Sequence, residues 1–224
     1  MTRSVAIDGP SGAGKSTIGY ALAQAIDATF VDTGLMYRAL TLAAVERGVD
    51  VEDGPLLGFL ASECRIEVER PRPEQADRLE TVRLDGRDVT TEVREPRIDR
   101  AVSAVSRHAE VRDAMLDVQR AVAARGDTVM VGRDIGTVVL PNASIKVFLT
   151  ADARVRAARR AAEMGAPDRL EEYLAEIERR DAADSGRAIA PLRQAEGALL
   201  LDTGLLSVDE CVAAIVARLE EIGA

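Results

Sequence analysis

The chain has 224 residues and a net charge of −9 at pH 7; 47% of its residues are hydrophobic but only 3% are aromatic. Length and hydrophobic content predict one large domain with an aliphatic core, into which smaller lobes can be inserted. The acidic balance and the scarcity of aromatic rings count against binding of nucleic acid by backbone neutralisation or base stacking.

The reactive side chains are few. Cys64 and Cys211 lie far apart, and His108 is the single histidine, so no metal-ligand cluster of Cys or His is expected. The N-terminus leads directly into an apolar segment, which predicts no signal peptide, and no apolar run has membrane-spanning length. We therefore expect a cytoplasmic protein with no membrane partner. Nothing in the sequence demands an oligomer, so a monomer is expected.

The first fifteen residues carry the strongest motif. Residues 5–8 predict a buried strand, and the apolar periodicity of residues 18–26 predicts a helix. Between them the sequence matches G-x-x-x-x-G-K-[ST], the loop that binds nucleotide phosphates between a strand and a helix. The motif's backbone N–H groups surround an anion, its lysine reaches the β/γ phosphates, and its hydroxyl binds Mg²⁺. The expected phosphate-binding residues are Gly9, Pro10, Ser11, Gly12, Ala13, Gly14, Lys15, Ser16 and Thr17.

The next stretch predicts a second strand over residues 29–32, a turn at 33–34 and a helix over 35–47. Asp32 ends the strand at the edge where parallel sheets bind ligands. Its carboxylate could hold Mg²⁺ through water or cap the following helix, and the sequence favours neither alternative.

Residues 63–92 have a different pattern. After a short helix over 53–63, two segments alternate with period two and are joined to a third by Asp85-Gly86, a strong hairpin signal. This stretch predicts a small antiparallel sheet inserted into a helix-and-strand chain.

Helices are predicted over 92–107 and 109–125, followed by core strands over 128–132 and 145–149. Arg133 and Asp134 follow the first of these strands. Such a charged pair is also common in an ordinary strand-to-loop turn.

Residues 152–188 are helical in pattern and rich in arginine, with a break at 165–167. Most of these charges fit a solvated helical surface. Arg156, Arg159 and Arg160 nevertheless share one side of a helix directly after a core strand, as a phosphate clamp requires. The chain ends in a strand over 199–202 and a helix that begins with a capping box, Ser207 and Glu210.

Together these elements predict an α/β fold, a P-loop doubly wound five-stranded parallel sheet flanked by helices. The expected core is residues 1–33, 121–151 and 189–224 of a single kinase domain. An acceptor-binding lobe over 34–120 would hold the small antiparallel β insert, and an Arg-rich helical lid would span 152–188. Lobes of this kind close over a nucleotide and exclude water.

Four motifs resemble those of bacterial cytidylate kinases, and the likeness covers essentially the whole chain. They are the phosphate loop, Asp32-Thr33-Gly34 with Tyr37-Arg38, Gly132-Arg133-Asp134-Ile135-Gly136-Thr137, and Arg180-Asp181 with Asp184, Arg187, Pro191 and Leu192. The resemblance implies MgATP-dependent phosphorylation of CMP and dCMP, with ATP and Mg²⁺ as cofactors and small molecules as the only partners. Ala183 stands where some relatives carry arginine, so that contact to ATP would be absent or supplied by Arg156, Arg159 or Arg160.

The resemblance also implies roles for individual residues. Lys15, Arg133, Asp134 and Arg180 would be catalytic, Ser16 and Asp32 would hold the metal, and Arg156 and Arg160 would help to bind ATP. The expected acceptor site comprises Thr33, Tyr37, Arg38, Ser103, Arg112, Arg133, Asp134, Arg180, Asp184 and Arg187.

The assignment agrees with the chemistry of cytosine. A carboxylate at Asp134 can accept from the exocyclic amine, and Arg112 can donate to the ring acceptors. Uracil has an oxygen in place of the amine and should lose about 1–3 kcal/mol or more. Two other readings remain open from the residues: a P-loop kinase for another acceptor (UMP, another monophosphate or a shikimate-like alcohol), or a nucleotide-dependent switch protein.

Overall fold

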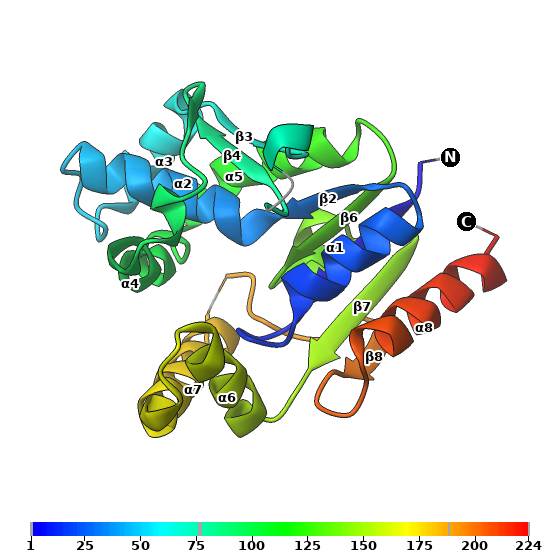
Figure 1. Ribbon diagram of the computed structural model, residues 1–224. Helices are drawn as coiled ribbons and strands as arrows, with labels where there is room; N and C mark the ends of the chain where they lie inside the picture. The colour runs from blue at the N-terminus through cyan, green and yellow to red at the C-terminus, as the bar shows by residue number, and fades with distance from the viewer. Residues whose placement is uncertain (1, 76–77, 188, 224) are drawn as a thin grey trace. The chain divides into compact units, whose positions relative to one another are not determined.

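The computed structural model describes residues 2–75, 78–187 and 189–223. The chain forms two compact units (Figure 1). The first unit is Met1–Ala28 with Gly126–Ala224, and the second unit is Thr29–Arg125. Among the described residues, no helix is both long and apolar enough to cross a membrane.

A five-stranded sheet has the order β2-β6-β1-β7-β8, with non-consecutive neighbours as in doubly wound folds. The pairings of β1 with β6, β1 with β7 and β7 with β8 are parallel. The predicted fold class is therefore confirmed. The strands are β1 (Ser4–Asp8), β2 (Thr29–Asp32), β6 (Thr128–Gly132), β7 (Ile145–Thr150) and β8 (Leu199–Asp202).

Helices of the first unit pack beside these strands. Helix α1 contacts both β6 and the C-terminal helix α8, and α6 pairs with α7. Their bounds are α1 (Lys15–Ala25), α6 (Ala153–Glu163), α7 (Leu170–Ser185) and α8 (Val208–Glu221). The predicted break between the Arg-rich helices is confirmed, as a short 3-10 turn at Pro167–Arg169. The capping box of Ser207 and Glu210 is also confirmed at the start of α8.

The second unit combines four helices with the predicted β insert. The helices are α2 (Thr33–Glu46), α3 (Gly54–Glu63), α4 (Pro96–Val105) and α5 (Ala109–Ala123). The insert is an antiparallel sheet in the order β3-β4-β5, formed by β3 (Ile66–Glu69), β4 (Thr81–Leu84) and β5 (Arg87–Asp88). Asp85 and Gly86 both have positive φ, as the predicted hairpin turn requires.

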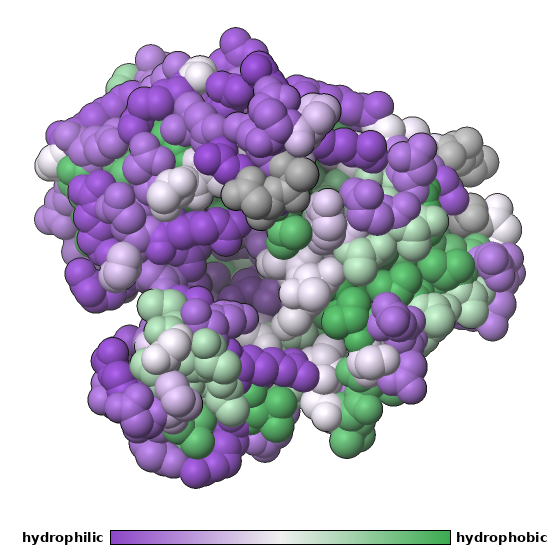
Figure 2. All heavy atoms as spheres, in the orientation of Figure 1, coloured by the Kyte–Doolittle hydropathy of each residue, from purple (hydrophilic) through white to green (hydrophobic). Residues whose placement is uncertain are grey.

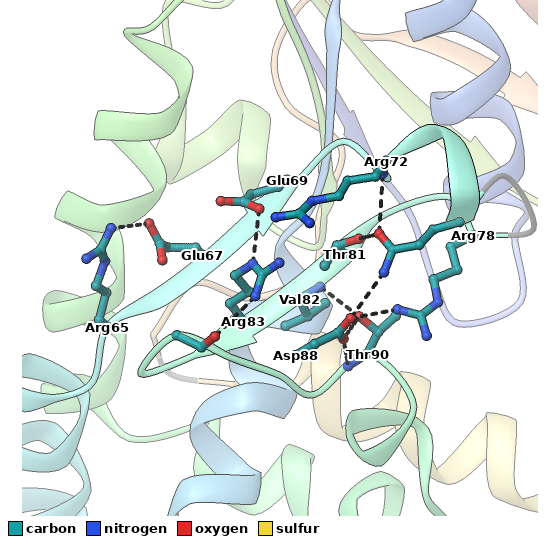
Figure 3. Close-up of polar contacts among 12 residues, drawn as sticks. Arg65, Glu67, Glu69, Arg72, Arg78, Thr81, Val82, Arg83, Asp88 and Thr90 are labelled. Carbon is teal, nitrogen blue, oxygen red and sulfur yellow. Dashed lines mark hydrogen bonds and ion pairs between the residues drawn. The ribbon is translucent and has the colours of Figure 1, made fainter.

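Charged side chains stabilise the insert from outside (Figure 3). Arg83 donates to Glu69 on the neighbouring strand at 3.2 Å, and Arg78 donates to Asp88 at 2.8 Å. Asp88 also accepts from the hydroxyl of Thr90 at 2.6 Å. These pairs are partly exposed, so each contributes little alone, and the buried valine and leucine side chains beneath supply most of the stability.

The core is aliphatic, as the composition predicts. The largest fully buried side chains include Ile7, Leu22 and Met130 in the first unit and Met36 and Leu40 in the second. Hydrophobic residues gather over α1 and α8 on the visible face, whereas the second unit is mostly hydrophilic there (Figure 2). The two cysteines, Cys64 and Cys211, are both free and buried.

Two local expectations are wrong, and one element was not expected. Thr33 begins helix α2 directly instead of forming a turn, because Asp32 already caps the helix. The helix expected over 92–107 is a 3-10 turn followed by α4, since Pro96 prevents the preceding residue from staying helical. The segment after Asp134, for which no element was expected, forms a π-helical turn, Ile135–Val139.

Candidate functional site

The phosphate loop joins β1 to α1 in the first unit, as predicted. Gly9 directly follows β1 and lies very close to β7. A Cβ at this position would lie 2.3 Å from the Leu149 carbonyl oxygen. Gly14 adopts a left-handed conformation, with φ of 78°, immediately before α1. Both positions therefore require glycine, and the loop's conformation is fixed by backbone geometry.

Lys15 is the first residue of α1, and its side chain folds back over the loop. The ammonium donates to the carbonyl oxygen of Pro10 at 2.7 Å, and the residue is 9% exposed. A carbonyl that holds an ammonium in this way occupies the cation until a stronger acceptor such as a phosphate oxygen arrives. Ser16 and Thr17 occupy the first turn of the same helix.

One of the three candidate clamp arginines, Arg156, contacts the loop directly. Arg156 is buried, donates to the Ser11 carbonyl at 3.0 Å, and forms an ion pair with Asp181 at 2.7 Å. Arg160 instead pairs with Glu163 within the same helix. The structure thus associates Arg156 with the phosphate loop, whereas Arg160 is half-exposed and pairs within α6.

Arg159 takes a structural role that the sequence did not reveal. It donates twice to Thr203, to the hydroxyl at 3.0 Å and to the carbonyl at 2.5 Å. The Thr203 hydroxyl lies 3.2 Å from the carbonyl of Ala13 and fastens the loop to the turn after β8. Threonine after a strand has no distinctive signal, and only the fold brings it to the loop.

A cluster of arginines surrounds Asp184 in the first unit. Arg133 donates to one oxygen of this carboxylate at 2.8 Å, and Arg187 donates to the other at 2.6 Å. Burial by itself would raise the pKa of Asp184. The charges of Arg133, Arg187 and Arg180 outweigh that effect and hold the pKa below its ordinary value. The carboxylate is therefore ionised and orients guanidinium groups from the end of β6 and from α7.

Asp134 follows Arg133 and is 5% exposed. Ile135 and Gly136, the next two residues, donate their backbone N–H groups to Asp8. Asp8 was expected only as the last residue of the strand over 5–8. The segment of Arg133 and Asp134 is thus tied to the residue that precedes the phosphate loop.

In the second unit, helices α2 and α5 bring together two predicted residues, Tyr37 and Arg112. The guanidinium of Arg112 lies 5.6 Å from the centre of the Tyr37 ring, within the range of a cation–π contact. Arg38 forms an ion pair with Asp99 of α4 at 2.5 Å and is largely buried. Thr33 is buried at the start of α2. Ser103 lies on α4 and is half-buried.

Asp32 acts as the N-cap of α2, since its side chain accepts from the Gly34 N–H at 2.9 Å. This is one of the two roles that the sequence left open. Its own N–H donates to the buried carboxyl of Glu80 at 2.7 Å. Glu80 lies just before β4 and belongs to no recognisable motif, so its contact with Asp32 could not be predicted from the sequence.

The described residues contain no group of three His, Cys, Asp or Glu side chains that could hold a metal ion by themselves. A magnesium ion bound with a nucleotide does not need such a group, because phosphate and water oxygens supply most of its ligands. One hydroxyl and one carboxylate, as at Ser16 and Asp32, are ligand types that suit it.

The comparisons with known proteins agree with the motifs. Residues 5–221 match the sequence profile of the cytidylate kinase family. A cytidylate kinase of Exiguobacterium sibiricum is 47% identical over 221 residues, covering 97% of this chain and 95% of the relative. A cytidylate kinase of Desulforamulus reducens is 44% identical over 222 residues, covering 98% and 97%.

A solved structure shares the fold. An uncharacterized protein from Eubacterium ventriosum superposes with a TM-score of 0.56 at 12% identity, and the match covers 99% of each chain. At that identity the likeness concerns the fold alone. The profile match and the relatives' identities extend over nearly the full length, so this chain belongs to the cytidylate kinase family.

Proposed function

We propose that this protein transfers the terminal phosphoryl group of ATP to CMP and dCMP, giving CDP and dCDP. The observation that carries the proposal is the family match over residues 5–221, which contains an unbroken phosphate loop. The relatives that share up to 47% of the sequence are named cytidylate kinases.

On the donor side, the N–H groups of residues 9–17 and the Lys15 ammonium would bind the phosphates of ATP. The contact of Arg156 with the Ser11 carbonyl supports a role for this arginine near the same phosphates. Arg160, one helical turn after Arg156, would add a second positive charge to the ATP site. Ser16 directly, and Asp32 through water, would hold Mg²⁺, which supplies charge neutralisation to the phosphates.

The acceptor phosphate would be bound by arginines that are already oriented by carboxylates. The pairs of Arg133 and Arg187 with Asp184, and of Arg38 with Asp99, support this proposal. A guanidinium carries five N–H donors, so it can keep its carboxylate and still donate to a phosphate. Arg180 would add charge, and the Tyr37 hydroxyl would add a donor.

The cytosine would be read by Asp134 and Arg112. The Asp134 side chain would accept from the exocyclic amine, and Arg112 would donate to the ring nitrogen and carbonyl. Ser103 and Thr33 offer hydroxyls to the acceptor. Asp184, besides orienting the arginines, would accept from the sugar hydroxyl.

The reaction needs no general base. The attacking oxygen belongs to a phosphate monoester, which is largely ionised near neutral pH. Catalysis then consists of aligning that oxygen with the γ-phosphorus and stabilising the charge that spreads over the transferred group. Lys15 and the arginines named above can do both, and His108 has no part to play.

An acceptor panel tests the proposal. ADP formation from MgATP would be measured with CMP, dCMP, UMP, AMP and GMP at equal concentrations. We expect CMP and dCMP to be preferred, with UMP at least about tenfold poorer, as loss of one hydrogen bond to an ionised group predicts. Equal rates with AMP, or ATP consumption that no acceptor changes, would overturn it.

We also propose that the protein acts as a monomer in the cytoplasm. Two buried free thiols suit a reducing compartment. Light scattering coupled to gel filtration would measure the mass in solution, for which the chain mass of 24.0 kDa is expected.

A further inference from the structure

Asp8 is a carboxylate buried within the sheet. It is the last residue of β1, and it lies opposite Gly132 of β6 and Phe148 of β7 in the strand registers. It is 2% exposed, and the phosphate loop begins at the next residue. Burial of a carboxylate is costly unless hydrogen bonds satisfy both of its oxygens, so its contacts indicate what it does.

Both oxygens of Asp8 bind the backbone of one short segment. One oxygen accepts from the N–H of Ile135 at 2.7 Å, and the other accepts from the N–H of Gly136 at 2.8 Å. A Cβ on Gly136 would lie 3.3 Å from the second oxygen, which is tight. These two N–H groups open the π-helical turn that directly follows Asp134, so the carboxylate fixes the position of that backbone.

Two charged groups act on Asp8 from neighbouring elements. Lys15 at the start of α1 favours the ionised carboxylate, and Asp134 at the start of the turn opposes it. Burial raises the pKa of Asp8 to about 6, although the hydrogen bonds from Gly136 and Ile135 and the charge of Lys15 lower it. The carboxylate is thus ionised at neutral pH but takes up a proton in mildly acidic solution.

We propose that Asp8 is a positioning residue for the acceptor base. By holding the N–H groups of Ile135 and Gly136, it fixes the backbone that carries Asp134 relative to the phosphate loop. The inference rests on the proposed function, because it assigns the reading of cytosine to Asp134.

The first test is Asp8→Asn, which keeps one acceptor oxygen and turns the other into a donor that cannot accept from Gly136. We expect the KM for CMP to rise about tenfold and the preference for CMP over UMP to shrink, because small misplacements in a site are costly. The KM for ATP should change less than about twofold.

Asp127→Asn is the matched control. Asp127 precedes β6 and accepts from the backbone N–H of Arg3 at 2.8 Å and from its guanidinium at 2.6 Å, so it too holds backbone, at the opposite end of the same strands. We expect a similar loss of stability with unchanged kinetics. If Asp8→Asn raises the KM values for ATP and CMP equally, or lowers only the melting temperature, the proposal is overturned.

Acidification provides a measurement in the wild-type protein, independent of how well any variant folds. The ratio of kcat/KM for CMP to that for UMP should fall as the pH drops through about 6. Titration of the substrate phosphates affects both acceptors alike and cancels in this ratio. A ratio that stays constant from pH 7.5 to 5.5 contradicts the proposal.

Amide hydrogen exchange separates this inference from the proposed function, since it needs no substrate. Exchange at Ile135–Val139 should be faster in Asp8→Asn than in wild type or Asp127→Asn. Wild type without a preference for CMP would overturn the proposed function and the role of Asp134 together. Wild type that prefers CMP, with Asp8→Asn unchanged in exchange and preference, would overturn only the role of Asp8.

Discussion

The phosphate loop and the β2–α2 junction are built on opposite principles. The loop is one contiguous run whose geometry is set by glycines and backbone contacts, such as the close approach of Gly9 to Leu149. The junction depends on side chains. Asp32 caps α2, and its own N–H donates to the carboxyl of Glu80, which lies far along the chain. A site formed by consecutive residues can be predicted from its motif, whereas a site formed by carboxylates from separate parts of the chain is found only in the three-dimensional structure.

The contrast extends to the cations of each region. Lys15 rests against a main-chain oxygen of its own loop, at Pro10. Arg38 and Arg133 instead rest against carboxylates from other helices, Asp99 and Asp184. Under the proposed function, a phosphate would displace a neutral carbonyl from Lys15 but would share the arginines with negative groups. The lysine should therefore respond to substitution more steeply than any one arginine partner.

The largest effect is expected at the loop. Lys15→Ala removes the only ammonium in the motif, and transfer to CMP should fall by about 10³-fold or more, because the charge it neutralises grows in the transition state. Circular dichroism and the melting temperature should stay close to wild type, since no apolar packing is lost. Retention of more than about a tenth of the turnover would show that backbone N–H groups suffice.

Asp134→Ala should have the next largest effect. If Asp134 accepts from the cytosine amine, as proposed, its loss should lower kcat/KM for CMP by about 10- to 100-fold, because removal of a hydrogen bond to a charged group costs about 1.5–3 kcal/mol. The KM for ATP, measured at saturating CMP, should hardly change. Weaker ATP binding with normal CMP binding would contradict the assigned role and blur the contrast between the two regions.

Substitution of Glu80 tests how much its hydrogen bond to Asp32 contributes to the unfolding free energy. Glu80→Ala leaves the buried N–H of Asp32 without its acceptor and should cost about 1–3 kcal/mol of unfolding free energy. Glu80→Gln keeps an oxygen in place and should cost clearly less. Urea denaturation of both variants measures the difference. Equal costs would show that an oxygen kept at this position does not stabilise the junction.

The smallest effect is expected at the surface of the insert, where Figure 3 shows the contacts of Asp88. Hydrogen bonds from Thr90 outweigh a small desolvation effect and, with Arg78, lower the pKa of Asp88 to about 2. A lowered pKa means that the stabilisation is present above about pH 4 and is lost as the pH falls toward 2. Asp88→Asn should make unfolding free energy less steep over that window than in wild type, as measured by denaturation at pH 4.5, 3.5 and 2.5. If the pH dependence of the unfolding free energy is the same in wild type and Asp88→Asn, solvent screens the interaction of Asp88 with Arg78 completely.

Much of the fold could be predicted because its signals are local. Strands over 29–32 and 128–132 were expected with the bounds that the structure has, and so was the capping box at Ser207. Each depends on side-chain alternation, an apolar run or a cap within a few residues. The errors at Thr33 and around Pro96 fall at helix ends, where one cap or one proline decides the boundary.

The phosphate loop, the β insert and the family could all be predicted from the sequence, because each motif and its flanking elements occupy consecutive residues. Only the tertiary structure decided which groups support the candidate site. Asp8 meets Gly136 across 128 positions, and Glu80 meets Asp32 across 48. Such pairings depend on which strands become neighbours in the sheet and on how the insert packs on α2, and no local pattern encodes either.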